Sequence, residues 1–124
     1  MPKAFSVGDR LKSFVFAFNG IKNAVLTQHN LLIHIVLAII ALLLGFLLKI
    51  SMVEWISIII VIGMVMAAEI FNSSIEELVN LISPVKNDKA RIIKDMSAGA
   101  VLIVAVAAFI TGVIIFLPKI LRLL

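Results

Sequence analysis

The sequence contains no cysteine and little charge, and the two shortages exclude different kinds of protein. Without cysteine, the 124-residue chain has no disulfides and no thiolate metal sites. Only 15% of its residues are charged, whereas 63% are hydrophobic. A soluble domain of this length keeps roughly half of its residues exposed and needs a more polar surface than this. The composition therefore predicts a single domain, residues 1–124, whose solvent is a lipid bilayer.

Several functional motifs are also missing. The chain has no glycine-rich loop of the P-loop type and no serine–histidine–aspartate pattern. Residues 1–26 lack an uninterrupted apolar core and contain scattered basic residues, so a secretory signal peptide is not expected. The formal net charge of +4 is explained by basic flanks that face anionic lipid head groups and the cytoplasm. Nucleic-acid binding is correspondingly disfavoured.

The first segment, residues 6–26, is predicted to be an amphipathic helix on the membrane surface. Its apolar residues step by three and four and so share one stripe: Leu11, Phe14, Phe18, Ile21 and Val25. A basic amphipathic helix with aromatic residues is typical of the membrane interface. The alternative is a helix that packs on a soluble partner.

Three further segments, residues 31–48, 55–82 and 97–117, are predicted to span the membrane as helices. The first is interrupted only by a histidine, His34. It is as well suited to an interhelical hydrogen bond as to binding a ligand, and it is given no catalytic role. Residues 50–54 are expected to connect the first two spans. Pro118 is expected to end the third span.

The distribution of basic residues predicts the orientation. Lys and Arg number four before the first span, one after it, four in the expected loop 84–94 and two after the third span. The positive-inside rule places the N-terminus and this loop in the cytoplasm and the C-terminus outside. Small residues in the third span, beginning with Ser97–Ala100, favour close packing against other helices, and three spans alone enclose too little volume for a deep site. An oligomer is therefore expected.

A stripe of polar residues follows the second span without any helix breaker. At about 100° per residue, one helix face carries Glu69, Asn72, Ser73, Glu76 and Asn80, with Glu77 at its margin. Ionisable residues at membrane depth are costly and commonly functional. Carboxylates and a carboxamide can hold Mg²⁺, and the nearby basic residues suit phosphoryl transfer from a nucleotide. The alternatives are a hydrogen-bonded seam between subunits and an ion or proton conductor.

Two motifs resemble those of a known family. The segments Glu69–Glu76 (EIFNSSIE) and Lys94–Val101 (KDMSAGAV) are similar to motifs of the membrane-integral prokaryotic diacylglycerol kinases, a family that also contains undecaprenol kinases. The resemblance extends over essentially the whole chain, including Ser13–Ile21 and Asn30–His34. It implies an all-α integral membrane fold, a surface helix and three spans per subunit, assembled as a homotrimer in the bacterial inner membrane.

The resemblance also implies a reaction and a role for each matching residue. The family transfers the γ-phosphoryl group of MgATP to a lipid hydroxyl. By motif position, Glu69 would be the catalytic base and Glu76 would bind Mg²⁺ and, through it, the nucleotide. Asn72 would support the phosphates or the base, and Lys94 and Asp95 would engage the nucleotide.

Three positions depart from the family pattern. Gln28 stands where a second metal-binding glutamate is usual, Asn80 where an acidic residue is usual, and Leu32 where one branch has arginine. A glutamine offers an oxygen but no charge, so weaker Mg²⁺ binding is expected. The alternatives are a ligand arrangement that uses Glu77 or a degenerate member that binds lipid or nucleotide without turnover. The lipid, diacylglycerol or undecaprenol, is left open, with Asn30–His34 and Ala98–Val101 resembling the undecaprenol kinases somewhat more.

Overall fold

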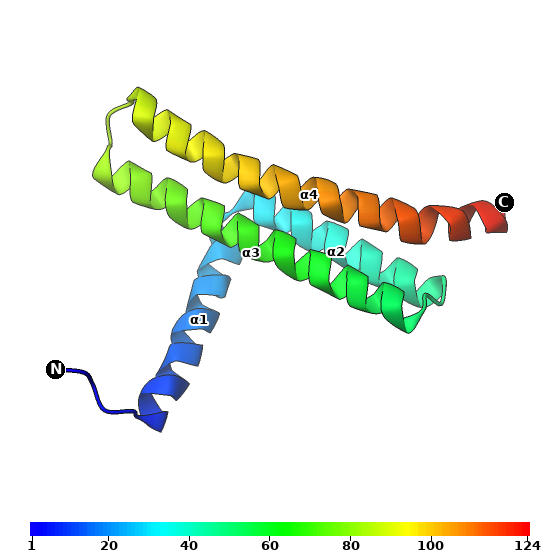
Figure 1. Cartoon of the computed structure of the whole chain (residues 1–124), viewed down its shortest axis with the longest axis horizontal. Helices are drawn as coiled ribbons and strands as arrows, with labels where there is room; N and C mark the ends of the chain where they lie inside the picture. Colours follow the sequence, from blue (N-terminus) through cyan, green and yellow to red (C-terminus); the bar gives the residue numbers. More distant parts are fainter.

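The computed structural model describes residues 1–124 and contains four α-helices. They are α1 (Val7–Thr27), α2 (His29–Leu47), α3 (Met52–Ile82) and α4 (Asp88–Leu123). Helices α2, α3 and α4 form an elongated bundle in which α3 and α4 run side by side, and α1 projects from it at a steep angle (Figure 1). The chain is therefore all-α, as the sequence predicts.

Helix α1 begins beside a serine cap and stands largely apart from the bundle. The Ser6 hydroxyl accepts a hydrogen bond from the backbone N–H of Asp9 at 3.3 Å, which satisfies one of the free donors of the first turn. None of its residues is buried within the chain. The helix lies within one residue of the expected range, while its position on a membrane surface stays a prediction.

A tight connection joins α2 to α3, and α3 begins earlier than expected. The backbone turns at Lys49, whose φ of 51° lies in the left-handed region. Ser51 and Glu54 then form a capping box in which each side chain accepts from the other residue's backbone N–H. This cap starts the helix at Met52, so the connection comprises residues 48–51 and lies earlier than the expected 50–54.

The expected basic loop over residues 84–94 is wrong. Only residues 83–87 separate α3 from α4, because the Asn87 side chain accepts from the backbone N–H of Ala90 at 2.8 Å and caps α4 there. Of the four basic residues assigned to the loop, Lys86 lies in the connection, and the other three lie on the first turns of a helix: Lys89, Arg91 and Lys94. Their side chains are consequently held on a regular scaffold.

The expectation that Pro118 ends the third long helix is also wrong, because α4 continues through this proline to Leu123. Proline removes one backbone donor, but tertiary contacts on both sides of it hold the helix. Ile115 and Phe116 are buried against α2 and α3, and Lys119 Nζ lies 3.1 Å from a carboxylate oxygen of Glu54. The packing on both sides of Pro118 therefore outweighs the tendency of proline to end a helix.

Very little of the chain is buried inside the subunit. Only 12 of 124 residues are buried, and large apolar side chains are exposed along all four helices. Water would not tolerate so much exposed apolar surface, whereas lipid or neighbouring subunits would. Helices α2, α3 and α4 are each long and apolar enough to cross a membrane. The chain is therefore a membrane protein.

Candidate active site

The most deeply buried ionisable side chain, Glu69, faces a histidine of the neighbouring helix. Glu69 on α3 is 4% exposed, and its Oε1 lies 3.4 Å from Nε2 of His34 on α2. An uncompensated carboxylate at this depth would be costly, so a polar partner is required. The two helices thus place one carboxylate and one imidazole together in otherwise apolar surroundings.

One turn further along α3, an amide and a second carboxylate meet. Asn72 is 7% exposed, and its Nδ2 donates a long, 3.5 Å hydrogen bond to Oε1 of Glu76. The Oδ1 of Asn72 is buried and has no hydrogen-bond partner in the chain. An unsatisfied buried acceptor costs about 1–3 kcal/mol. It is therefore a position where a cation or a donor from a ligand would be stabilised.

The polar end of α3 is joined to the first turns of α4 by a lysine. Lys94 Nζ donates to Oδ1 of Asn80 at 2.6 Å. Because the amide is neutral, this bond holds the ammonium group without cancelling its charge. Asp95 forms an exposed ion pair with Arg91 at 3.4 Å, one helical turn away. Such exposed pairs contribute about 0.3–0.5 kcal/mol, so Asp95 can exchange this partner for another at little cost.

Gln28 lies at the junction of α1 and α2, where its extended backbone separates the two helices. Its side-chain Nε2 donates to the Thr27 hydroxyl at 3.4 Å, and no hydrogen bond joins it to Glu76. No group of three or more His, Cys, Asp or Glu side chains could hold a metal ion within the chain. The single chain thus brings together Asn72 and Glu76, and not Gln28.

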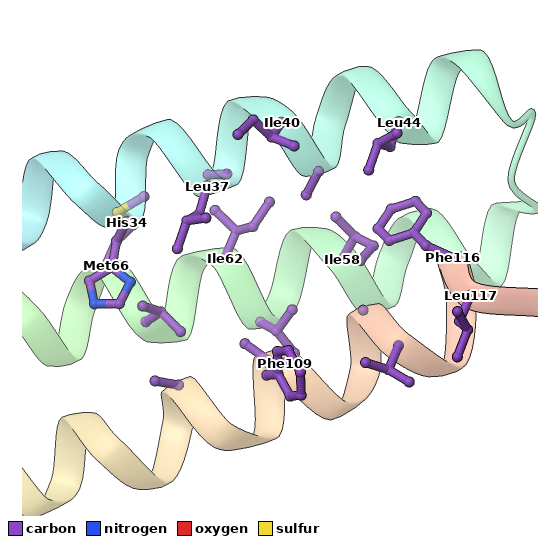
Figure 2. A pocket seen from close by; sticks show the side chains of 18 of the residues that line it. His34, Leu37, Ile40, Leu44, Ile58, Ile62, Met66, Phe109, Phe116 and Leu117 are labelled. Carbon is purple, nitrogen blue, oxygen red and sulfur yellow. The ribbon is translucent and has the colours of Figure 1, made fainter. Parts of the chain in front are cut away.

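An apolar groove of about 520 Å³ runs along the bundle between α2, α3 and α4. Seventeen of its 19 lining residues are hydrophobic, and His34 is the one ionisable residue among them. His34 and Met66 lie at one end, whereas Phe116 and Leu117 lie near the α2–α3 connection (Figure 2). The groove therefore leads along the bundle to the residue that contacts Glu69.

Sequence reasoning gave His34 no catalytic role, and the structure places its side chain against Glu69. The sequence did indicate an interhelical hydrogen-bonding function as one possibility, and its contact with Glu69 agrees with that reading. Both residues are polar interruptions of apolar helices that are joined by a tight antiparallel turn. His34 lies 13 residues before the end of α2 and Glu69 lies 17 residues after the start of α3, so chain distance from the turn brings the two interruptions to neighbouring levels but does not by itself pair them.

Comparison with known proteins identifies the family. A family model described as prokaryotic diacylglycerol kinase matches residues 15–116. An undecaprenol kinase of Bacillus subtilis is 41% identical over 108 residues, which cover 87% of this chain and 88% of that protein. A diacylglycerol kinase of Synechocystis is 33% identical over 115 residues, which cover 92% of this chain and 66% of that protein. The chain belongs to the prokaryotic diacylglycerol kinase family.

Proposed function

We propose that this lipid kinase transfers the γ-phosphoryl group of ATP to the hydroxyl of undecaprenol. The lipid oxygen forms the new bond to the γ-phosphorus, the bond to the β,γ-bridging oxygen breaks, and ADP leaves. The hydroxyl proton passes to Glu69. The choice of undecaprenol rests on the 41% identity to the Bacillus subtilis enzyme, and diacylglycerol is the competing acceptor because of the Synechocystis relative.

The buried carboxylate of Glu69 is the observation that carries the mechanism. A general base must reach the acceptor proton while water is excluded from the transferring group. Glu69 is almost inaccessible, and the groove that ends at its partner His34 can guide an apolar lipid chain to it. A seam would account for the Glu69–His34 contact but not for an apolar groove of about 520 Å³ that ends at it, so this arrangement supports catalysis over the alternative of simple helix packing.

The residues one turn away are suited to Mg²⁺. The free Oδ1 of Asn72 and the carboxylate of Glu76 offer oxygen atoms, the ligands that Mg²⁺ prefers while it keeps several waters and binds phosphates. When bound, Mg²⁺ would neutralise charge on the nucleotide phosphates. Gln28 would add a neutral oxygen in the assembled enzyme. We assign Glu76 and Gln28 to the metal and Asn72 to the phosphates or the metal.

Lys94 and Asp95 are assigned to the nucleotide. The ammonium group of Lys94 is fixed by a neutral amide and keeps its charge for a phosphate oxygen. Asp95 is exposed on the same turn of α4 and is bound only by a weak pair with Arg91. These two side chains complete a polar cluster at the end of the bundle opposite the α2–α3 connection.

The proposed assembly is a homotrimer in the bacterial inner membrane, with its N-terminus and the residue 83–87 connection in the cytoplasm. Two observations support it. The largely exposed helix faces need partners or lipid, and the polar cluster within one subunit lacks enough charged ligands for a metal site. A neighbouring subunit would supply further groups. The cytoplasmic orientation also gives the site access to ATP.

Two substitutions test the separate roles of the carboxylates. With purified protein in micelles and ATP labelled at the γ-position, undecaprenol and diacylglycerol are offered separately. Glu69→Gln should abolish transfer, a loss of at least about 100-fold, with nucleotide binding largely retained, because a base acts on the acceptor. Glu76→Gln should instead weaken Mg²⁺-dependent nucleotide binding.

The matched control is Glu54→Gln, at the opposite end of the same helix, which should retain transfer. Equal loss of ATP binding in Glu69→Gln and Glu76→Gln would contradict the assignment of separate roles. Nucleotide binding without transfer to either lipid by the unsubstituted protein would favour the degenerate, non-catalytic alternative that the neutral Gln28 raises.

A further inference from the structure

His34 is placed to act on Glu69 and not merely to fill space. It is the polar side chain that meets the Glu69 carboxylate, at 3.4 Å from Nε2 to Oε1, and the glutamate is only 4% exposed. A neutral imidazole carries one N–H donor, and that donor can be Nε2. An apolar residue of the same size would fill the same volume without offering a donor.

The contact occupies one carboxylate oxygen and leaves the other free. If Nε2–H donates to Oε1, the carboxylate plane is fixed and Oε2 is available to accept a proton. The 3.4 Å separation is longer than a settled N–H···O bond, and such contacts commonly tighten when substrate is bound. His34 also lines the groove, so an acceptor hydroxyl that arrives along it passes the same imidazole.

We infer that His34 is a positioning residue that holds the Glu69 carboxylate with one oxygen directed at the acceptor hydroxyl. The inference rests on the proposed role of Glu69 as the base. His34 is not expected to contact the nucleotide. It lies on α2 at the apolar groove, whereas the residues assigned to Mg²⁺ and the nucleotide lie further toward the polar end of the bundle: Asn72, Glu76 and Lys94. Loss of the donor should therefore impair the transfer step and leave ATP affinity unchanged.

The test compares two substitutions of similar size, one with a donor and one without. His34→Gln keeps a side-chain N–H, whereas His34→Met keeps only bulk. Transfer is measured at saturating lipid while ATP is varied, so that kcat and the KM for ATP are obtained separately. His34→Met should lower kcat by about 10- to 100-fold, the usual scale for removing a group that orients a functional side chain, with the KM for ATP unchanged. His34→Gln should recover most of this loss.

The control is His29→Met, an exposed histidine at the start of the same helix, which should leave kcat unchanged. Unchanged kcat in His34→Met would overturn the inference, as would equal losses in the Gln and Met variants. A rise in the KM for ATP as large as the fall in kcat would also overturn it, since it would indicate general distortion of the site. If the unsubstituted protein phosphorylates neither lipid, the proposed function fails before the variants are compared.

Discussion

Single buried polar atoms define the chemistry that this site can support. The unpaired Oδ1 of Asn72 and the carboxylate of Glu69 lie on one face of α3, and each is nearly inaccessible. Asn80 accepts from Lys94 where an acidic side chain would have neutralised the ammonium charge. Because Asn80 is neutral, Lys94 keeps its charge for a phosphate oxygen.

The residue-scale prediction concerns Gln28. If its side chain belongs to the metal shell of the assembled enzyme, Gln28→Glu adds a charged oxygen ligand, and Mg²⁺ affinity rises with ligand charge. The variant should bind MgATP more tightly, by about tenfold or about 1.4 kcal/mol, and turn over faster at limiting Mg²⁺. Nucleotide titrations at several Mg²⁺ concentrations provide the measurement.

The control for this prediction is Gln28→Met, which keeps the length of the side chain and removes its oxygen. This variant should bind Mg²⁺ more weakly and need more Mg²⁺ to bind nucleotide. If neither substitution alters Mg²⁺ dependence, Gln28 lies outside the metal shell. Glu77, exposed on the next position after Glu76, would then be the first residue to examine.

At the scale of secondary structure elements, the α2–α3 hairpin depends on a close approach at Gly45. A methyl group at this position would lie 2.7 Å from Cη2 of Trp55 and 3.1 Å from Cδ1 of Ile50. Trp55 cannot move freely, because its ring packs against Phe46 with a centroid distance of 4.9 Å. The glycine therefore permits the contact that closes the hairpin.

Gly45→Ala should consequently lower the free energy of unfolding, measured by SDS titration in micelles, by about 1 kcal/mol net. Overpacking costs about 1–3 kcal/mol and outweighs the gain of up to about 1 kcal/mol in helix propensity. Gly20→Ala on α1 is the matched control: no atom lies within 4 Å of the added methyl, so stability should hold or rise slightly. A more stable Gly45→Ala protein would show that Trp55 gives way easily.

The sequence predicts the helices and the polar stripe of α3 because both follow from periodicity along one chain segment. It does not predict which residue of α2 faces Glu69, since that depends on how two apolar helices rotate against each other. It also misplaces both ends of the third long helix. The cap at Asn87 and the packing around Pro118 decide those ends, and each depends on neighbours that a linear pattern does not show.

The whole molecule leaves most of its helix surface exposed, and the proposed assembly can be tested at Gly99. An added methyl at this glycine meets no atom of the same chain within 4 Å, so the small residue is not required for packing inside the subunit. If it permits close approach between subunits, Gly99→Leu should reduce the oligomer mass measured by light scattering in micelles.

For this assembly test, Met96→Leu is the control, because it changes an exposed side chain of the same helix without adding bulk. Its mass should match that of the unsubstituted protein. A fully intact, monodisperse oligomer in Gly99→Leu would mean that this part of α4 faces lipid.

The orientation of the molecule can be tested with single cysteines, because the chain has none of its own. Asp88 and Leu123 are the terminal residues of the 36-residue helix α4, which is about 54 Å long. In intact cells an impermeant thiol reagent should label Leu123→Cys, and it should reach Asp88→Cys only after permeabilisation. Labelling of both from the same side would overturn the three-span topology.

The unequal lengths of the helices bear on how deep the proposed site lies in the bilayer. Helix α2, with 19 residues, is about 28 Å long and matches the ~30 Å hydrocarbon layer, whereas α3 and α4 extend past its start (Figure 1). His34 lies five residues into α2, so a hydrocarbon edge at the start of this helix would place Glu69 about 7 Å beneath it. Glu76, two turns further on, would then lie at the level of the head groups. The phosphates of ATP can thus stay at the wet edge of the bilayer, while the lipid brings its hydroxyl a few ångströms below it.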